Sequence, residues 1–421
     1  MTRPSVPNPL APHGVFIADP EAHQMPDGAW YVYGSLDVTR HQYCSRRYDM
    51  LWSADGAEWH HESSTFSTEG VAGAGAHRLY APDAVHHGGR YYLFYCLSDS
   101  SEGVATADHP LGPFGEARPL EGLTQIDPTV FIDDDGQGYL YWGQFSAKAA
   151  RLTPDLQAIV PGSQVEGVIT EAEHFFHEGC SIRKRQGIYY LSYAHIGRRN
   201  RPSCIGYATA TSPLGPFTYR GVIVDNFGCD PESWNNHGCI SEFQGEWYVF
   251  YHRSSHGCRS MRKTCAERIT FDDQGLIPEV PMTSSGIGGP LPVTARLDAG
   301  RACMLAGHVR SCDTPGGYSD LTEIQDGDAA CYRWLDFADG TDHITVCVAG
   351  GGFGGTVEVH LDAVDGPLIG IVNIAGRWPG DWATHSAEVT KTAGLHAVWL
   401  VFRGTGEALF DLRWIRFFSR R

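Results

Sequence analysis

Apolar and polar residues alternate along most of the chain, and up to about residue 270 they follow one pattern that occurs five times. Each copy starts with a polar or acidic residue, continues with a short apolar run, and reaches a glycine that aromatic residues follow. The five glycines are Gly28, Gly89, Gly138, Gly187 and Gly245. Repeats of about 50 to 60 residues made of short alternating strands are typical of a β-propeller, with one repeat per blade. The pattern therefore predicts five blades.

The rest of the chain predicts a second domain. The segment PMTSSGIGGPLP (281–292) is rich in Pro, Gly and Ser, which indicates a linker. Beyond it, runs such as HITVCVAG and AVWLVFRG alternate without continuing the repeat, which favours a β-sandwich of about 130 residues. We expect an all-β protein with a five-bladed β-propeller over residues 1–285 and a jelly-roll β-sandwich over residues 286–421.

Composition narrows the range of partners. The 421 residues carry a formal charge of −17 and no basic cluster, which argues against nucleic acid and anionic membranes. An acidic surface suits a neutral ligand such as a sugar, and it equally keeps a protein soluble. The N-terminus lacks the apolar core of a secretory signal, and the twelve cysteines are scattered without a CxxC pair. We expect a cytoplasmic protein with reduced thiols, although a truncated secreted protein would begin in the same way.

The residue at the head of each repeat is polar in all five copies. These residues are Asp19, Asp83, Asp127, Glu178 and His237. Because the innermost strand of each blade lines the central channel, equivalent positions are expected to meet at one mouth of that channel. Carboxylates that close together raise one another's pKa, which points to a chemical task. The alternative for any single copy is that the acidic residue caps the preceding turn.

Short motifs around these residues resemble one enzyme family. They are ADP at Asp19, APD at Asp83, IDPTVFIDDDG at Asp127, HEGCSIRKRQGIYYLSYA at Glu178 and NNHGCISEFQGEWYVFYH at His237. In this order, one per blade, they are similar to the family 43 glycoside hydrolases, and the resemblance covers about residues 13 to 285. It implies a five-bladed propeller enzyme that removes arabinofuranosyl, xylosyl or galactosyl units from plant polysaccharides.

The resemblance also implies catalytic roles. By motif, Asp19 is the general base, Asp127 orients and tunes its neighbours, and Glu178 is the general acid. An inverting glycosidase needs one carboxylate to activate water and one carboxylic acid to protonate the leaving oxygen, about 6.5–9.5 Å apart. The acid has to keep its proton near neutral pH, and a charged Asp127 beside it would favour this by repulsion.

His237 is expected below these carboxylates. The resemblance implies a central ion, often calcium, that this histidine meets largely through water molecules. Calcium prefers oxygen ligands, so the alternative is that His237 supports the carboxylates by hydrogen bonding. We expect no organic cofactor.

Four further residues are candidates for binding the sugar. Tyr80 stands where many relatives have a pocket tryptophan, and Asp83 belongs to the APD motif of the second blade. Asp37 in YGSLD is a candidate for a sugar hydroxyl, with turn capping as the alternative. Arg262 matches in rough position an arginine that reaches the pocket in the family. Two nearby arginines compete for this role, Arg259 and Arg268.

The second domain resembles a family 6 carbohydrate-binding module through GGFGGTVEVHLDAVDGPLIG and LFDLRWIRF. Such modules often hold a sugar between two aromatic rings. This chain departs from that pattern, because Glu323 and Ala329 stand where aromatic residues are expected and Asp411 replaces a common asparagine. Trp378 and Trp382 remain as candidate stacking rings. The two interpretations are a sugar-binding domain and a structural brace for the propeller.

Together these features predict an exo-acting, inverting glycosidase that releases terminal neutral sugars from oligosaccharides or polysaccharide side chains. An α-L-arabinofuranosidase is favoured, and β-xylosidase, β-galactofuranosidase and exo-galactosidase stay open. The presence of Asp19 argues against one galactan-acting subgroup that lacks this residue. The alternative class is a sugar-binding propeller without catalysis, which has no need of both Asp19 and Glu178. A sialidase would need clustered arginines and repeated Asp boxes, which the sequence does not clearly contain.

Overall fold

Short antiparallel strands form nearly all of this protein. The computed structural model describes residues 6–69, 71, 73–350, 352–376 and 380–420. Within these residues, thirty-one strands are accompanied by one helix, α1 (Glu171–His174), and one 3-10 turn, η1 (Ala299–Arg301). The fold is all-β, as the sequence predicts.

Five sheets follow one another from β1 to β19, and in each of them neighbouring strands of the chain pair with each other. The first two sheets contain β1 (Ile17–Gln24), β2 (Trp30–Leu36), β3 (Arg47–Ser53), β4 (His60–Ser67), β5 (Asp83–His87), β6 (Arg90–Cys96), β7 (Ser101–Ala107) and β8 (Gly115–Thr124). The third and fourth contain β9 (Thr129–Ile132), β10 (Gly138–Trp142), β11 (Ser146–Arg151), β12 (Val165–Thr170), β13 (Phe176–Arg185), β14 (Ile188–His195), β15 (Cys204–Ala210) and β16 (Thr218–Asp225). The fifth contains β17 (Ile240–Phe243), β18 (Glu246–Arg253) and β19 (Lys263–Ile269).

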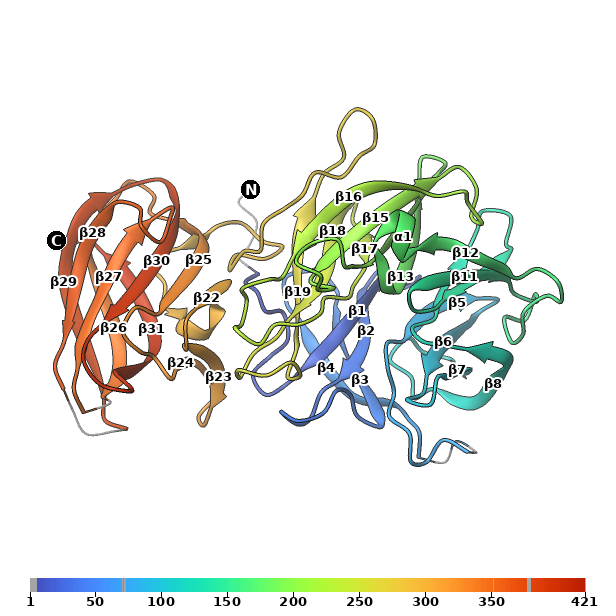
Figure 1. The fold of residues 1–421 in the computed structure, drawn as a ribbon, viewed down its shortest axis with the longest axis horizontal. Helices are drawn as coiled ribbons and strands as arrows, with labels where there is room; N and C mark the ends of the chain where they lie inside the picture. The colour runs from blue at the N-terminus through green and yellow to red at the C-terminus, as the bar shows by residue number, and fades with distance from the viewer. Residues whose placement is uncertain (1–5, 70, 72, 351, 377–379, 421) are drawn as a thin grey trace.

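The first strands of the five sheets form a ring. β1 contacts β5, β5 contacts β9, β9 contacts β13, β13 contacts β17, and β17 contacts β1 again. Trp30 of the first sheet stacks on Phe243 of the fifth, with ring centroids 4.6 Å apart. Beside β19, the Asn8 side chain donates to the carbonyl oxygen of Ala266 and accepts from its N–H, both at 3.0 Å. These contacts complete the five-bladed propeller that the repeats predict (Figure 1).

The C-terminal part is a sandwich of two six-stranded sheets. One sheet contains β20 (Leu291–Pro292), β22 (Met304–Ala306), β25 (Ala329–Asp336), β27 (Gly355–Leu361), β28 (Leu368–Ile374) and β30 (Leu395–Arg403). The other contains β21 (Leu297–Asp298), β23 (Arg310–Thr314), β24 (Tyr318–Thr322), β26 (Thr341–Gly350), β29 (Trp382–Thr392) and β31 (Phe410–Phe418). Alternate apolar residues of both sheets form one buried core, as the period-2 pattern requires.

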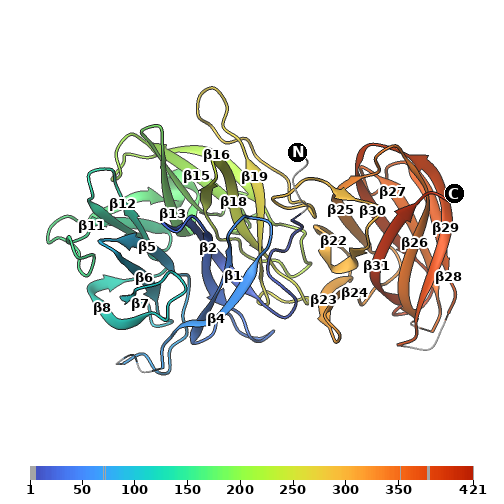
Figure 2. The ribbon, with the colours of Figure 1, turned by 180° about the vertical axis from the view of Figure 1, so that it is seen from behind.

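The sandwich and the propeller share a second apolar core. Cys331 and Trp399, on strands β25 and β30, belong to the same buried cluster as Tyr207 of the fourth blade and Tyr251 of the fifth. Ala329, where the sequence comparison expects a tryptophan, also lies in this cluster. Both views of the ribbon show the sandwich beside the blade that contains β19 (Figures 1 and 2). The sandwich is therefore packed against the propeller and not held by a linker alone.

Two further observations concern the cysteines and the length of the helices. All twelve cysteine side chains are free thiols, and ten of them are buried. In the part of the chain that the structure describes, no helix has the length and apolar character needed to cross a membrane.

Candidate active site

A pocket of about 510 Å³ opens where the innermost strands of the propeller begin. It brings together six of the eight residues that the sequence singles out. These six are Asp19, Tyr80, Asp127, Glu178, His237 and Arg262. The three carboxylic acids come from the first, third and fourth blades, so they face a common space although they are far apart in the sequence.

Irregular backbone aims these carboxyl groups at the pocket. Asp19 and Asp127 adopt left-handed conformations with φ of 53° and 61°. The pairing of β1 with β2 shifts between Ala18 and Glu21, and that of β13 with β14 shifts on both sides of Glu178. Such bulges turn a side chain away from the regular alternation of a strand. The strained backbone at the head of the strands is therefore part of how the site is built.

Asp19 is held as a carboxylate by a buried arginine. Nη1 of Arg262 donates to Oδ1 of Asp19 at 2.9 Å, and both side chains are almost inaccessible to solvent. Burial by itself raises the pKa of Asp19, but Arg262 and the nearby His252 and His237 outweigh it and bring that pKa well below its usual value. An ionised carboxylate at this position is suited to accept a proton from water.

Asp37 binds Arg262 and does not line the pocket. Its carboxylate accepts from Nε of Arg262 at 2.9 Å, from Nη2 at 3.1 Å and from the Cys44 N–H at 2.9 Å. Asp37 is 1% exposed, so the prediction that it binds a sugar hydroxyl is wrong. Its structural function is to orient Arg262 toward Asp19.

The two competing arginines lie elsewhere. The Arg259 guanidinium stacks over the Trp234 ring at 4.4 Å, and Arg268 pairs with Glu246 at the surface. Arg262 is therefore the arginine that reaches the carboxylates.

The pKa of Asp127 is shifted in the direction opposite to that of Asp19. Burial, followed by the negative charges of Glu178 and Asp19, raises the pKa of Asp127 well above its usual value. Glu178 is half-buried, and its Oε2 accepts from Nε2 of Gln144 at 2.8 Å. The sequence predicts repulsion between Asp127 and Glu178, and in the structure the charge of Glu178 contributes to the raised pKa of Asp127.

His237 touches the functional residues of three blades. Its Nδ1 lies 3.7 Å from Oδ1 of Asp19 and 3.9 Å from Oδ2 of Asp127. A Cβ atom on Gly179, the residue after Glu178, would collide with its ring. Burial lowers the pKa of His237, so the ring is neutral at physiological pH. These contacts support the interpretation that His237 holds the carboxyl groups in position.

The second-blade Asp83 lies one layer below the pocket. A buried layer below the pocket contains Glu21 and Thr129, which are 3% and 1% exposed. Asp83 belongs to this lower layer, because its Oδ2 accepts from Oγ1 of Thr129 at 2.7 Å and its Oδ1 lies 2.7 Å from Nε2 of His23. The prediction that Asp83 binds substrate is therefore wrong. The residues just before β5 that line the pocket are Arg78, Tyr80 and Ala81.

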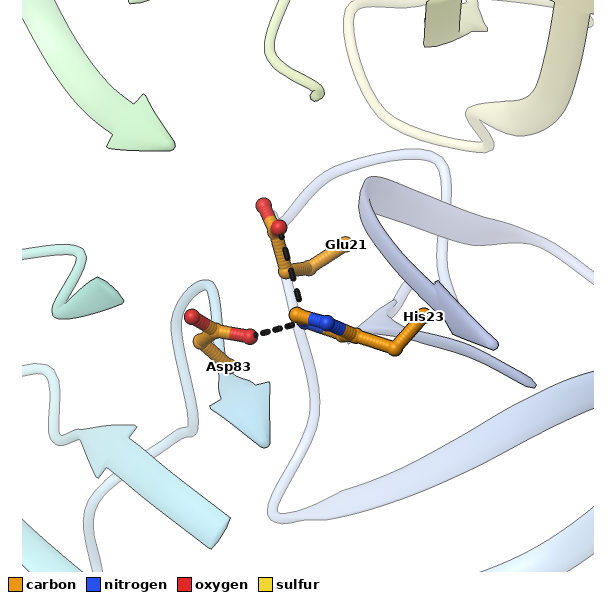
Figure 3. A group of neighbouring side chains, drawn as sticks. All are labelled: Glu21, His23 and Asp83. Carbon is orange, nitrogen blue, oxygen red and sulfur yellow. Dashed lines mark hydrogen bonds and ion pairs between the residues drawn. The ribbon is translucent and has the colours of Figure 1, made fainter. Parts of the chain in front are cut away.

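The lower layer is a candidate site for the expected ion. Glu21, His23 and Asp83 are the only group in the described part of the chain whose ligand atoms all lie within 4.8 Å of one another in a metal-like arrangement (Figure 3). Arg183 already supplies a positive charge to this group. It donates through Nη2 to Oε1 of Glu21 and through Nη1 to Oγ of Ser181, the latter at 3.2 Å. Calcium needs about six to eight oxygen ligands. The residues present do not fit it while Arg183 stays in place.

This arrangement predicts that Arg183 and not a divalent cation neutralises the channel. We expect chelation with EDTA to leave the activity and Tm of the protein unchanged. Arg183→Met is expected to lower stability by about 3–5 kcal/mol, because it leaves buried carboxylates without their cation. Added Ca²⁺ should then raise the Tm of this variant. Thermal unfolding measures both effects, with the exposed Arg151→Met as the control, and loss of activity on chelation of the unaltered protein would contradict the prediction.

Several pocket residues carry no motif in the sequence. Gln144 contacts Glu178, Trp234 forms a wall, and the ring of Tyr43 lies 4.6 Å from the Arg262 guanidinium. His252 lies behind Asp19, whose N–H donates to its Nδ1 at 3.2 Å. Each lies in a loop or outside the head position of a repeat, so only the closure of the propeller brings it to the site.

The fold and the pocket together define a carbohydrate-cleaving enzyme of the propeller type, a glycoside hydrolase. The family profile "Glycosyl hydrolases family 43" matches residues 7–277, and "Carbohydrate binding module (family 6)" matches residues 307–419. The chain belongs to glycoside hydrolase family 43. Both resemblances seen in the sequence are confirmed.

Two relatives match almost the whole chain, and a third matches 67% of it. A "Xylosidase/arabinosidase" of Thermoclostridium stercorarium is 30% identical, over 95% of this chain and 97% of that protein. The crystal structure of an arabinoxylan arabinofuranohydrolase from Bacillus subtilis with cellotetraose gives a TM-score of 0.58 at 28% identity and covers 99% of both chains. A β-xylosidase/α-arabinofuranosidase from a compost metagenome, solved with xylotriose in a calcium-free form, gives 0.57 at 29% identity, over 67% of this chain and 99% of that one.

The sandwich differs from a simple aromatic clamp. Trp378 lies outside the described residues. Trp382 does not present a free ring, because the Arg413 guanidinium stacks 3.6 Å from its centroid and 3.9 Å from that of Tyr318. Burial and the charge of a nearby aspartate raise the pKa of Asp411 to about 6. Tyr318 and Trp382 are thus both engaged by Arg413 of the same domain.

Proposed function

We propose that this protein is an exo-acting, inverting α-L-arabinofuranosidase that removes single terminal sugars from xylan-type oligosaccharides. The observation that carries the proposal is the asymmetry of the carboxyl groups across one pocket. Asp19 is buried against Arg262 and ionised, whereas Glu178 is half-buried on another blade with Gln144 on one oxygen. One acidic group is thus kept ready to take a proton, and another faces the pocket from across the channel.

In the proposed reaction, Asp19 accepts a proton from a water molecule that attacks the anomeric carbon. Glu178 gives its proton to the glycosidic oxygen as that bond breaks, so the hydroxyl of the leaving sugar is restored. His237 lies between Asp19 and Asp127 and helps to hold them in position, and the pKa of Asp127 is raised by burial and by the charges of Glu178 and Asp19. The products are the free sugar with inverted configuration and the shortened chain.

The floor of the pocket supports exo action. Glu21, Asp83, Thr129 and Ser181 are all buried directly below the catalytic layer and bonded to one another or to Arg183. These residues close the pocket from below, and a pocket with a closed floor suits a terminal sugar. Relatives named for both xylosidase and arabinosidase activity make β-xylosidase the second candidate.

A panel of nitrophenyl glycosides tests the proposal. We expect the highest kcat/KM with the α-L-arabinofuranoside, followed by the β-D-xyloside, and little turnover of galactosides. Proton NMR of the first product should show inversion of the anomeric carbon. A retained configuration would exclude Asp19 as a base that activates water, and no turnover of any glycoside would favour a sugar-binding propeller.

A further inference from the structure

The sandwich reaches the active site through one buried ion pair. Lys263 is the first residue of β19 and directly follows Arg262. Its Nζ lies 2.6 Å from Oδ1 of Asp313, which belongs to strand β23 of the sandwich. Each of the two side chains is 7% exposed, so solvent does not compete for this contact. The residue next to the pocket arginine is thus fixed by the other domain.

Strand β23 also holds the loop that leads to this position. The N–H of His256 donates to the carbonyl oxygen of Ser311 at 2.8 Å. The N–H of Asp313 donates to Nε2 of the same histidine at 3.0 Å. The loop from His256 to Arg262 carries Arg259, which stacks on the pocket residue Trp234. One strand of the sandwich therefore supports a wall of the pocket as well as its arginine.

Asp313 contacts the first blade from the other side. Its Oδ2 accepts from the N–H of Gly14 at 2.7 Å, just before the strand that carries Asp19. Its Oδ1 also accepts from Oγ of Ser319 at 2.6 Å, which fixes the carboxylate within the sandwich. Asp313 thus connects the segments that lead to both members of the Asp19–Arg262 pair.

We propose that Asp313 is a positioning residue for catalysis: through Lys263 and His256 it keeps Arg262 on Asp19, and so the sandwich sets the ionisation of the general base. Buried ion pairs add little net stability, because desolvation offsets their attraction, but they fix geometry. Removing one partner leaves the other charged, buried and displaced. This proposal rests on the proposed function of Asp19 and gives the sandwich a task that does not require it to bind sugar.

The pH dependence gives a readout that stability alone does not change. The charged and titratable groups around Asp19 are Arg262, His252, His237, Asp127, Tyr43 and Cys44. Of these, Arg262 does most to offset the effect of burial and to lower the pKa of Asp19. If Arg262 moves away, burial dominates and the pKa of Asp19 rises. The base is then protonated at a higher pH, so the acidic limb of kcat/KM moves upward.

The test uses the full chain with Asp313→Asn and Lys263→Met. We expect kcat/KM to fall by about 10- to 100-fold, as small misplacements of catalytic groups do, with an acidic limb displaced upward by at least about one pH unit. Asp313→Glu, which keeps the charge, should recover most of the limb position. The matched control is Asp320→Asn, which breaks the Asp320–Arg413 pair inside the sandwich and should lower Tm without moving the limb.

Two results would overturn the proposal. One is an unchanged acidic limb in Asp313→Asn and Lys263→Met while both are folded at the assay temperature. The other is that both variants unfold at every assay temperature while Asp320→Asn stays folded, which would assign the pair a purely structural function. Failure of the proposed function is seen separately, because activity would then survive substitution of Asp19 itself.

Discussion

Asp19→Asn is expected to lower kcat/KM by about 100- to 10,000-fold on every substrate, activated aryl glycosides included. The amide cannot take a proton from water, and departure of a good leaving group does not replace that step. Arg262 keeps its contacts with Asp37, so the pocket should stay folded. Initial rates with aryl and natural substrates measure the loss.

The control for this variant is Asp108→Asn, which changes an exposed aspartate of the second blade. It should leave the rates unchanged. Thermal unfolding of both variants shows whether the loss comes from chemistry or from the fold. If Asp19→Asn were folded and retained most of its activity, the water-activating base would have to be another group.

Glu178→Gln is expected to give a loss that depends on the leaving group. A sugar alkoxide leaves poorly without a proton, so the natural linkage should lose about 1,000- to 10,000-fold in kcat/KM, at the upper end for general acid catalysis. Nitrophenolate leaves without protonation, so the aryl glycoside should lose much less. The ratio of the two losses, measured on the same enzyme preparation, isolates the protonation step from binding.

Gln144→Leu is the matched control, because it removes the partner of Glu178 and keeps the acid. Its loss should be smaller and nearly equal on both substrates. Equal losses in Glu178→Gln would count against Glu178 as the acid, whatever their size. Asp127→Asn should then be examined, since burial and neighbouring charges raise the pKa of its carboxyl group well above the usual value.

The sequence located the three carboxyl groups that line the pocket because a propeller repeats its register. Asp19, Asp127 and Glu178 stand at the head of their repeats, and each head lies at the start of an innermost strand. The same reasoning failed for Asp83. Its APD motif looks equivalent to the ADP of Asp19, but its side chain lies one layer deeper, where Glu21 lies in the first blade. A bulge after Ala18 makes that difference, and bulges leave no clear trace in the residue pattern.

The residues that contact the carboxylates could not be predicted from the sequence, for another reason. Arg262 lies 243 positions from Asp19 and 225 from Asp37. Nothing in the local pattern separates it from Arg259 or Arg268, because the distinction depends on where a loop of the fifth blade meets the first blade. The same holds for Gln144 and Trp234, which reach the pocket only when the ring of blades closes.

The all-β class, the five blades, the sandwich and the residue types that face the channel could be predicted from the amino-acid sequence. These follow from local periodicity and from repetition, which every segment carries in its own residues. Folding is needed to set the depth of each residue in the channel, the pairing of Asp19 with Arg262, the burial that raises the pKa of Asp127, and the contact between Asp313 and Lys263. Burial and ion pairing arise between segments that are distant in the chain, so their effects exist only once the blades and the sandwich have come together.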